Sequence, residues 1–256
     1  MENIETHFEQ VGDGRVARVV IDRREKSNAL NSGMIAKLTQ AFEILAAAAD
    51  LRAVVLSAAG GKAWVGGADV REMGALADAG AARAFIAALH GAMLAVRDLP
   101  VPVVAEIDGV CLGAGMELAA ACDLRVASSN ACFGMPEVQV GLPSVIEASL
   151  LPGLMGRGRA ARLVLTGEVI DATRAEAWGF VEDVVAPDAL RATVDALVSV
   201  LCKAGPNAVR AQKRLTRYWE RVDPDTAAED SVSTFGEAFT TGEPAEKLSA
   251  VFAGKK

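Results

Sequence analysis

Short β-branched runs alternate with long alanine- and leucine-rich stretches up to about residue 171, and this alternation constrains the fold more than any other feature. Residues 16–21, 53–56 and 101–107 are bounded by glycine, proline or charge, as strands usually are. Weaker strand candidates lie at 125–127 and 181–185. Helical spacing is found in the stretches between these runs, at residues 32–48, 81–97, 114–121 and 144–151. Strand, helix and strand in this order predict an α/β body.

The remainder of the chain has a mainly helical pattern. Helices are expected at residues 172–178, 186–202, 206–219, 226–239 and 244–252. A helical tail of this kind packs on its own body or on a neighbouring subunit. The full length of 256 residues suits one large domain, or one domain with a small appendage, that buries roughly three-quarters of its unfolded surface.

Charge and composition exclude several classes of protein. The formal net charge of −7 argues against nucleic acid as a partner, because phosphate binding normally requires a basic surface. The longest apolar stretch, residues 101–122, contains Glu106, Asp108 and Glu117, so no membrane span is expected there. The opening MENIETHFEQ is acidic and polar, unlike a signal peptide, and its conformation is expected to be mobile. A cytoplasmic location is therefore predicted.

The four cysteines do not point to a metal or to disulfides. Cys111, Cys122, Cys132 and Cys202 form no CxxC pair and have no clustered histidine beside them. They are interpreted as buried small apolar residues, and no metal site is expected.

Two glycine-rich segments could present backbone amides to a ligand. In the first, WVGGADVREM, Gly66 and Gly67 precede Ala68 and a charged, helix-like stretch. In the second, GVCLGAGME, glycines follow a predicted strand and lead into an apolar helix that contains Glu117. Glycine permits close backbone approach, and free amides at the start of a helix donate to an anionic oxygen. An ordinary tight turn is the alternative, and the second segment matches neither GxGxxG nor GK[ST].

Glu117 and Glu137 are the candidate acid and base. Glu117 lies among apolar residues, although a glutamate at the start of a helix can also serve only as a cap. Glu137 follows Pro136, and the alternative for this residue is an ordinary loop charge. Two carboxylates beside two amide donors would stabilise an oxyanion while they move protons. His7 and His90 are not expected to be catalytic, and the chain has no GxSxG elbow for serine hydrolysis.

Together these motifs resemble the crotonase superfamily along nearly the whole chain, and most closely its enoyl-CoA hydratases. The segment REKSNAL at residues 24–30 resembles the early loop that contacts CoA. Gly67-Ala68-Asp69 and Gly113-Ala114-Gly115 resemble the two oxyanion-hole turns, and Pro136-Glu137 resembles the later catalytic segment. LTGE at residues 165–168 and AWGFV at 177–181 resemble the stretch that leads into the C-terminal helices.

The resemblance implies a fold and an assembly. Residues 1–185 would form an α/β spiral of ββα units that carries the acyl-CoA site. Residues 186–256 would form a C-terminal helical trimerisation region, which makes a homotrimer or a dimer of trimers. It implies no separate cofactor, because CoA is part of the acyl-CoA substrate.

The resemblance also implies roles for individual residues. The amides of Ala68 and Ala114 would polarise the thioester carbonyl. Since both glutamates are present, it points to hydration of a 2-enoyl-CoA, with Glu117 helping to activate water and Glu137 delivering a proton to the α-carbon. The two carboxylates would share one site, so their ionisations are expected to be coupled.

Contacts to CoA or to the acyl group are implied at Lys26, Ala29, Gly67, Asp69, Val70, Arg71 and Gly113. CoA is anionic and the chain is acidic, so basic groups are expected near the entrance. Arg23, Arg24 and Lys62 are further candidates, with a solvated surface charge as the alternative for each. Lys255 and Lys256 would reach a ligand only if the tail folds back.

The chain departs from the family pattern at two points. Ala114 stands where many relatives have glycine, which leaves an amide in place. After Gly141 the usual glycine-rich loop is replaced by LPSVIE, which is one residue shorter. Glu147 ends this segment and could add a third carboxylate, although a position on the exposed face of a helix is expected.

Two other functions remain open. A Δ3,Δ2-enoyl-CoA isomerase needs a proton shuttle without activated water, so one carboxylate would suffice for it. A catalytically silent CoA-binding subunit would be expected to have lost a glutamate. The acyl chain length, branching and pathway are not determined by these motifs.

Overall fold

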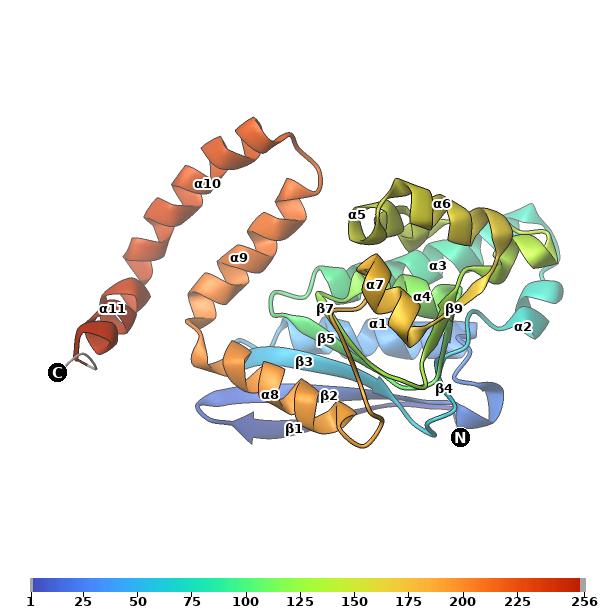
Figure 1. Cartoon of the computed structure of the whole chain (residues 1–256), viewed down its shortest axis with the longest axis horizontal. Coiled ribbons are helices and arrows are strands. Elements are labelled where there is room, and N and C mark those ends of the chain that lie inside the picture. The colour runs from blue at the N-terminus through green and yellow to red at the C-terminus, as the bar shows by residue number, and fades with distance from the viewer. Residues whose placement is uncertain (1, 254–256) are drawn as a thin grey trace.

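The five predicted strands all belong to one six-stranded sheet in the computed structural model, which describes residues 2–253 (Figure 1). Its strand order is β1-β2-β3-β5-β7-β10, with β1 and β2 antiparallel and the remaining neighbours parallel. The strands are β1 (Asn3–Val11), β2 (Gly14–Asp22), β3 (Leu51–Ala58), β5 (Val103–Ile107), β7 (Leu124–Ser128) and β10 (Asp183–Val185).

A second sheet of four short strands continues from the first. It has the order β4-β6-β8-β9 and consists of β4 (Ala63–Val65), β6 (Val110–Leu112), β8 (Cys132–Gly134) and β9 (Val169–Asp171). Successive strands of the chain alternate between the two sheets in the pairs β3–β4, β5–β6 and β7–β8. In each pair the first strand belongs to the large sheet and the second to the small sheet, and the element that follows the second strand in the sequence is a helix. This repetition is the predicted spiral of ββα units, and the α/β class is confirmed.

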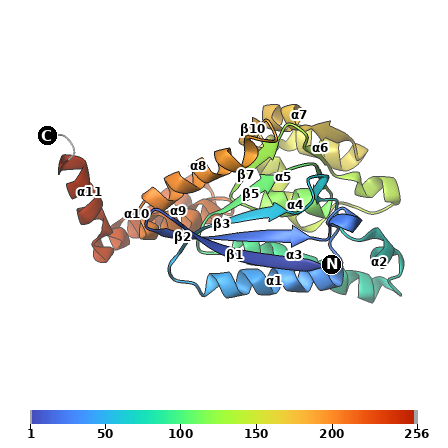
Figure 2. The same cartoon turned by 90° about the horizontal axis from the view of Figure 1, so that it is seen from below.

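Helices cover the two faces of the large sheet. On one face α1 (Ser32–Ala46) and α3 (Ala79–Arg97) lie against each other and bury large side chains such as Phe42 and Met93 (Figure 2). On the other face α8 (Leu190–Lys203) packs Val194 and Val198 against the sheet. The short helix α4 (Ala114–Ala121) is buried along its whole length, which places Glu117 in the interior.

The largest differences from the sequence prediction concern short elements. The N-terminal segment is not mobile but forms β1, which pairs along its full length with β2. The four three-residue strands of the small sheet were missed because so short a run cannot display alternation. The helix α6 (Arg157–Thr166) was also missed, and residues 144–151 contain the 3-10 helix η3 (Ile146–Leu150) followed by α5 (Leu151–Met155) instead of one α-helix.

The C-terminal helices leave the body as an arm (Figure 1). After α7 (Ala172–Trp178) and α8, the arm consists of α9 (Pro206–Trp219), α10 (Pro224–Ala238), the 3-10 helix η4 (Phe239–Thr241) and α11 (Glu243–Ala253). Large apolar side chains on the arm are exposed, namely Val232, Phe235, Phe239, Leu248 and Val251. The predicted division of the chain at residue 185 stays a prediction.

Among the described residues, one helix is long and apolar enough to cross a membrane by length and composition alone, namely α3. Core helices pass the same test, and α3 buries Phe85, Leu89, Ala92, Met93 and Val96 inside the protein. The stretch 101–122, judged from the sequence as the longest apolar candidate, is divided among β5, β6 and α4.

Candidate active site

The first glycine turn connects β4 to the short helix α2 (Val70–Gly74). A parallel β-bridge pairs Ala68 with Leu30, because the Leu30 amide donates to the Gly67 carbonyl and the Asp69 amide donates to the Leu30 carbonyl, each at 2.9 Å. Gly67 has a φ of +122°, which L side chains rarely adopt. Within residues 2–253 no acceptor is found for the Ala68 N–H, so this amide remains free to donate to a ligand.

The second glycine turn connects β6 to α4. Gly113 has a φ of +50°, and its amide donates to the Gly134 carbonyl at 2.9 Å. Gly115 lies directly on β4, because a Cβ at this position would be 2.1 Å from the Val65 carbonyl oxygen. The Ala114 N–H in the first turn of α4 likewise has no acceptor among the described residues.

Glu117 is almost completely buried in α4, with 4% of its surface exposed. Its Oε1 accepts a hydrogen bond of 3.1 Å from the Ala148 N–H. The pKa of Glu117 is raised to about 8, mainly by burial and also by the neighbouring carboxylates of Glu137 and Glu147, while the Ala148 hydrogen bond opposes the shift. Glu117 therefore keeps its proton at neutral pH in the ligand-free site.

Glu137 reaches the same region from the 3-10 helix η2 (Pro136–Val140). Its Oε1 lies against Gly113, where a Cβ would be only 2.5 Å away, and the Ser144 hydroxyl donates to its Oε2 at 2.8 Å. Ser144 was missed by the sequence analysis. It belongs to the unusual segment after Gly141, but no pattern in that segment distinguishes it from a loop serine.

The two turns and the two carboxyl groups line one cavity of about 190 Å³. The polar part of its wall contains Ala68, Ala114, Glu117 and Glu137, together with Gly67 and Gly113. Most of the remaining wall is apolar and is formed by Val70, Met73, Ile86, Leu89, Val140, Leu142 and Val145. Such a cavity suits a short apolar chain whose carbonyl oxygen receives amide hydrogen bonds while nearby carboxyl groups transfer protons.

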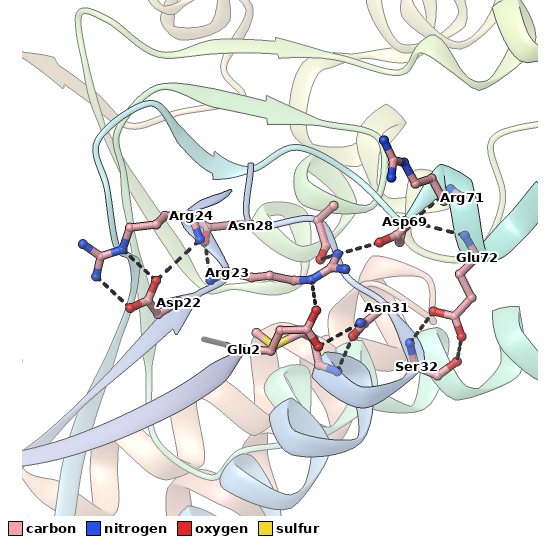
Figure 3. A network of polar contacts seen from close by, with 12 residues as sticks. Glu2, Asp22, Arg23, Arg24, Asn28, Asn31, Ser32, Asp69, Arg71 and Glu72 are labelled. Atoms are coloured by element: carbon pink, nitrogen blue, oxygen red, sulfur yellow. Dashed lines mark hydrogen bonds and ion pairs between the residues drawn. The ribbon is translucent and has the colours of Figure 1, made fainter. Parts of the chain in front are cut away.

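Arg23 has a structural position, so the alternative of a solvated surface charge was wrong for this residue. It is only 7% exposed, and its guanidinium donates to Glu2 and Asp69, both at 2.6 Å, and to the Ala29 carbonyl at 3.0 Å (Figure 3). Asp69 also accepts from the Arg71 amide at 2.9 Å and so caps α2. This network fixes the loop that carries Ala29 against the first glycine turn.

The remaining predicted contacts divide into two groups. Gly67, Val70 and Gly113 line the cavity, whereas Lys26, Ala29, Asp69 and Arg71 lie outside its wall. The predicted cations Lys26, Lys62 and Arg71 are exposed, and Arg24 is paired with Asp22 at 2.7 Å. Lys255 and Lys256 lie outside the described residues.

Glu147 was expected on an exposed helix face, and this prediction was wrong. Only 2% of its surface is exposed, and its two carboxylate oxygens lie 3.0 and 3.1 Å from Nδ1 of His90 on α3. The contact spans 57 positions in the sequence, so no local pattern could have revealed it.

The spiral of ββα units, the cavity between successive turns and the C-terminal helices define a crotonase-fold enzyme. The chain belongs to the enoyl-CoA hydratase/isomerase family, because the model of that family matches residues 12–250. It is 34% identical to the short-chain-enoyl-CoA hydratase of Clostridium acetobutylicum, over 95% of this chain and 94% of that protein. It is 32% identical to the crotonyl-CoA hydratase of Syntrophomonas wolfei, over 94% and 93%.

Solved structures agree with this assignment. The enoyl-CoA hydratase of Bacillus anthracis superposes with a TM-score of 0.93 at 30% identity, over 100% of this chain and 97% of that chain.

Proposed function

We propose that this chain is a hydro-lyase that adds water reversibly and syn to a 2-enoyl-CoA, giving a 3-hydroxyacyl-CoA. The observation that carries the proposal is the pair of carboxyl groups, Glu117 and Glu137, in one apolar cavity with the free amides of Ala68 and Ala114. The small cavity and the names of the short-chain and crotonyl-CoA relatives favour a short acyl chain.

In this proposal the Ala68 and Ala114 amides donate to the thioester oxygen and stabilise the enolate that forms during addition. The ionised carboxylate takes a proton from water as the water oxygen bonds to the β-carbon. The protonated carboxyl delivers its proton to the α-carbon, so the pair still carries one proton after turnover, now on the other member. We also propose that Lys26 and Arg71 contact the phosphate groups of CoA.

The proton that is delivered to the α-carbon was expected on Glu137 from the family resemblance, and the structure favours a different carboxyl group. The raised pKa of Glu117 favours the proton on Glu117 in the ligand-free site. The Ser144 hydroxyl donates to Oε2 of Glu137 at 2.8 Å. We therefore place the proton on Glu117 in the ligand-free site and treat the two ionisations as coupled during turnover.

The pH dependence of kcat/KM should follow this shared proton. The pKa of Glu117 is raised to about 8, so the proton is present at neutral pH and is lost as the pH rises through that value. We expect kcat/KM for crotonyl-CoA to fall on the alkaline side near pH 8, because this parameter reports groups of the free enzyme. Initial rates from about pH 6 to about pH 10 test this, and a profile that stays level beyond pH 9 would contradict it.

The direct test of the function is the loss of conjugated enoyl-thioester absorbance when enzyme is added to crotonyl-CoA. Rapid loss, with formation of 3-hydroxybutyryl-CoA, supports the hydratase. The rival isomerase predicts conversion of a 3-enoyl-CoA without hydration of any 2-enoyl-CoA, and that result would overturn the proposal. A silent subunit predicts neither reaction.

We further propose that the chain is a cytoplasmic homotrimer or dimer of trimers, assembled through residues 186–256 without nucleic acid or membrane partners. The exposed apolar side chains of α10 support this, because Val232 and Phe235 are 72% and 71% exposed. A hollow of about 730 Å³ lies between α8, the start of α9 and α11, whereas further along α9 Lys213 joins the arm to the body through the Val101 carbonyl and Asp123.

Replacing Phe235 by aspartate should therefore shift the protein toward monomer, because a charge replaces apolar area that the assembly would bury. Light scattering after size-exclusion chromatography measures the mass. Glu229→Gln on the same helix is the control and should keep the parent mass. A monomeric parent protein at micromolar concentration would refute the assembly.

A further inference from the structure

The buried carboxylate of Glu147 depends on one residue. Within residues 2–253, His90 is the only hydrogen-bond or ion-pair partner of this carboxylate, through Nδ1 at 3.0 and 3.1 Å. A carboxylate inside a protein is costly unless a hydrogen-bond donor or a positive charge accompanies it. The His90 ring is itself 43% exposed, so it joins the buried carboxylate to the surface of α3.

The contact lies at the turn that binds Glu117. Glu147 belongs to η3, and the amide of the next residue, Ala148, donates to Glu117 at 3.1 Å. Ile146 on the other side has a φ of +40°, a left-handed conformation that is rare for a β-branched residue. Strained backbone of this kind persists only where its surroundings hold it. The Glu147 side chain, bound to α3, is one adjacent contact that can do so, beside the Ala148 amide, which donates to both the Val145 carbonyl and Glu117.

We propose that His90 and Glu147 are a positioning pair for Glu117: His90 binds the Glu147 carboxylate and so keeps η3 in the conformation that directs the Ala148 amide to Glu117. Neither residue lines the cavity, so the pair acts through Glu117 without touching the substrate. Ile86, one turn before His90 on α3, does line it, which places the pair immediately behind the apolar wall. The catalytic consequence of this pair rests on the proposed function.

The pair also contributes to the electrostatic environment of Glu117. The charged groups that face Glu117 are Glu137 from η2 and Glu147 from η3, and the titratable ring of His90 from α3 stands behind Glu147. Both carboxylates raise the pKa of Glu117. Removal of the charge on Glu147 should therefore let Glu117 ionise at lower pH.

Three variants separate positioning from simple structural support. Glu147→Gln retains the shape but not the charge, and we expect the alkaline limb of kcat/KM to move down by roughly half a pH unit or more. His90→Ala leaves Glu147 unpaired, and we expect kcat to fall by roughly tenfold or more, with KM for crotonyl-CoA little changed. His90→Gln offers an amide donor in place of the ring and should restore most of the lost kcat.

Glu106→Gln is the matched control. Glu106 is a mostly buried glutamate on β5 that pairs with Arg18 and is absent from the cavity wall. Its variant should keep the parent pH profile. The proposal is overturned if Glu147→Gln and His90→Ala both keep the parent pH profile and kcat, or if His90→Gln is as impaired as His90→Ala.

A second measurement distinguishes failure of the pair from failure of the proposed function. The carboxyl band of Glu117, identified in infrared spectra by its loss in Glu117→Gln, can be titrated without any reaction. If the parent protein hydrates no enoyl-CoA but Glu147→Gln still lowers the Glu117 midpoint, the hydratase proposal fails and the pair stands. If hydration is rapid and the midpoint does not move, the pair fails alone.

Discussion

Replacing Glu117 by glutamine is expected to lower kcat for crotonyl-CoA hydration on the order of a hundredfold or more, because it removes a positioned acid/base group. Glutamine has nearly the same volume, and its carbonyl oxygen can still accept the Ala148 amide that bonds Glu117 at 3.1 Å. The fold and the cavity should therefore survive. Loss of proton transfer should then be the dominant change, with KM much less affected.

Stopped-flow or steady-state absorbance at several crotonyl-CoA concentrations separates kcat from KM in this variant. Glu106→Gln is again the appropriate control, since it also replaces a largely buried glutamate but lies outside the cavity wall. Retention of more than about a tenth of the parent kcat by Glu117→Gln would show that Glu117 is not an essential acid or base.

The second large effect is expected at Gly115, where alanine should both destabilise the protein and reduce activity. The new Cβ would lie 2.1 Å from the Val65 carbonyl oxygen, and neither β4 nor α4 has a flexible side chain there that could yield. The start of α4 must move, and it carries both the Ala114 amide and Glu117. We expect a loss of about 3 kcal/mol in the free energy of unfolding and a roughly hundredfold loss in kcat/KM from misplacement of about 1 Å.

Gly158→Ala provides the comparison for this prediction. Gly158 lies in the exposed part of α6 with no atom within 4 Å of an added Cβ. Its variant should keep full activity and gain up to about 1 kcal/mol, because alanine favours the helix. Urea unfolding of both variants gives the free energies. Equal stability and activity for Gly115→Ala and the parent would mean that α4 does not pack on β4 as closely as described.

The sequence predicted those parts of the site that depend on local geometry. A glycine at the end of a strand followed by a helix leaves free amides wherever the chain folds, so Ala68 and Ala114 could be recognised as donors from their neighbours alone. Glu117 three residues into an apolar helix was likewise recognisable as a carboxyl group in a low-polarity setting. The boundaries of α4, α7 and α9 were predicted to the residue, because capping glycine, proline and apolar spacing mark them.

Charged side chains were harder to place from sequence. Arg23 and Lys26 are three residues apart in one basic segment, yet Arg23 is buried by Glu2 and Asp69 while Lys26 is exposed. The difference arises because Glu2, just before β1, and Asp69, just after the first glycine turn, both reach Arg23 from outside this segment. The position of a long basic side chain depends on the residues that surround it in the folded protein. Composition alone therefore could not distinguish a structural arginine from one that contacts a ligand.

The sequence by itself determined the α/β class and marked the two glycine turns and the two candidate carboxyl groups, because these follow from hydrophobic period, glycine placement or residue type over a few neighbouring positions. The succession of ββα units was expected only from the resemblance to the crotonase superfamily, because strands of three residues show no periodicity. The tertiary structure alone decided that Glu137 receives the Ser144 hydroxyl and that Glu147 is buried against His90. It also decided the raised pKa of Glu117. Burial, partnership and proton affinity depend on the distances between segments remote in the chain, and those distances exist only after the helices and strands have packed.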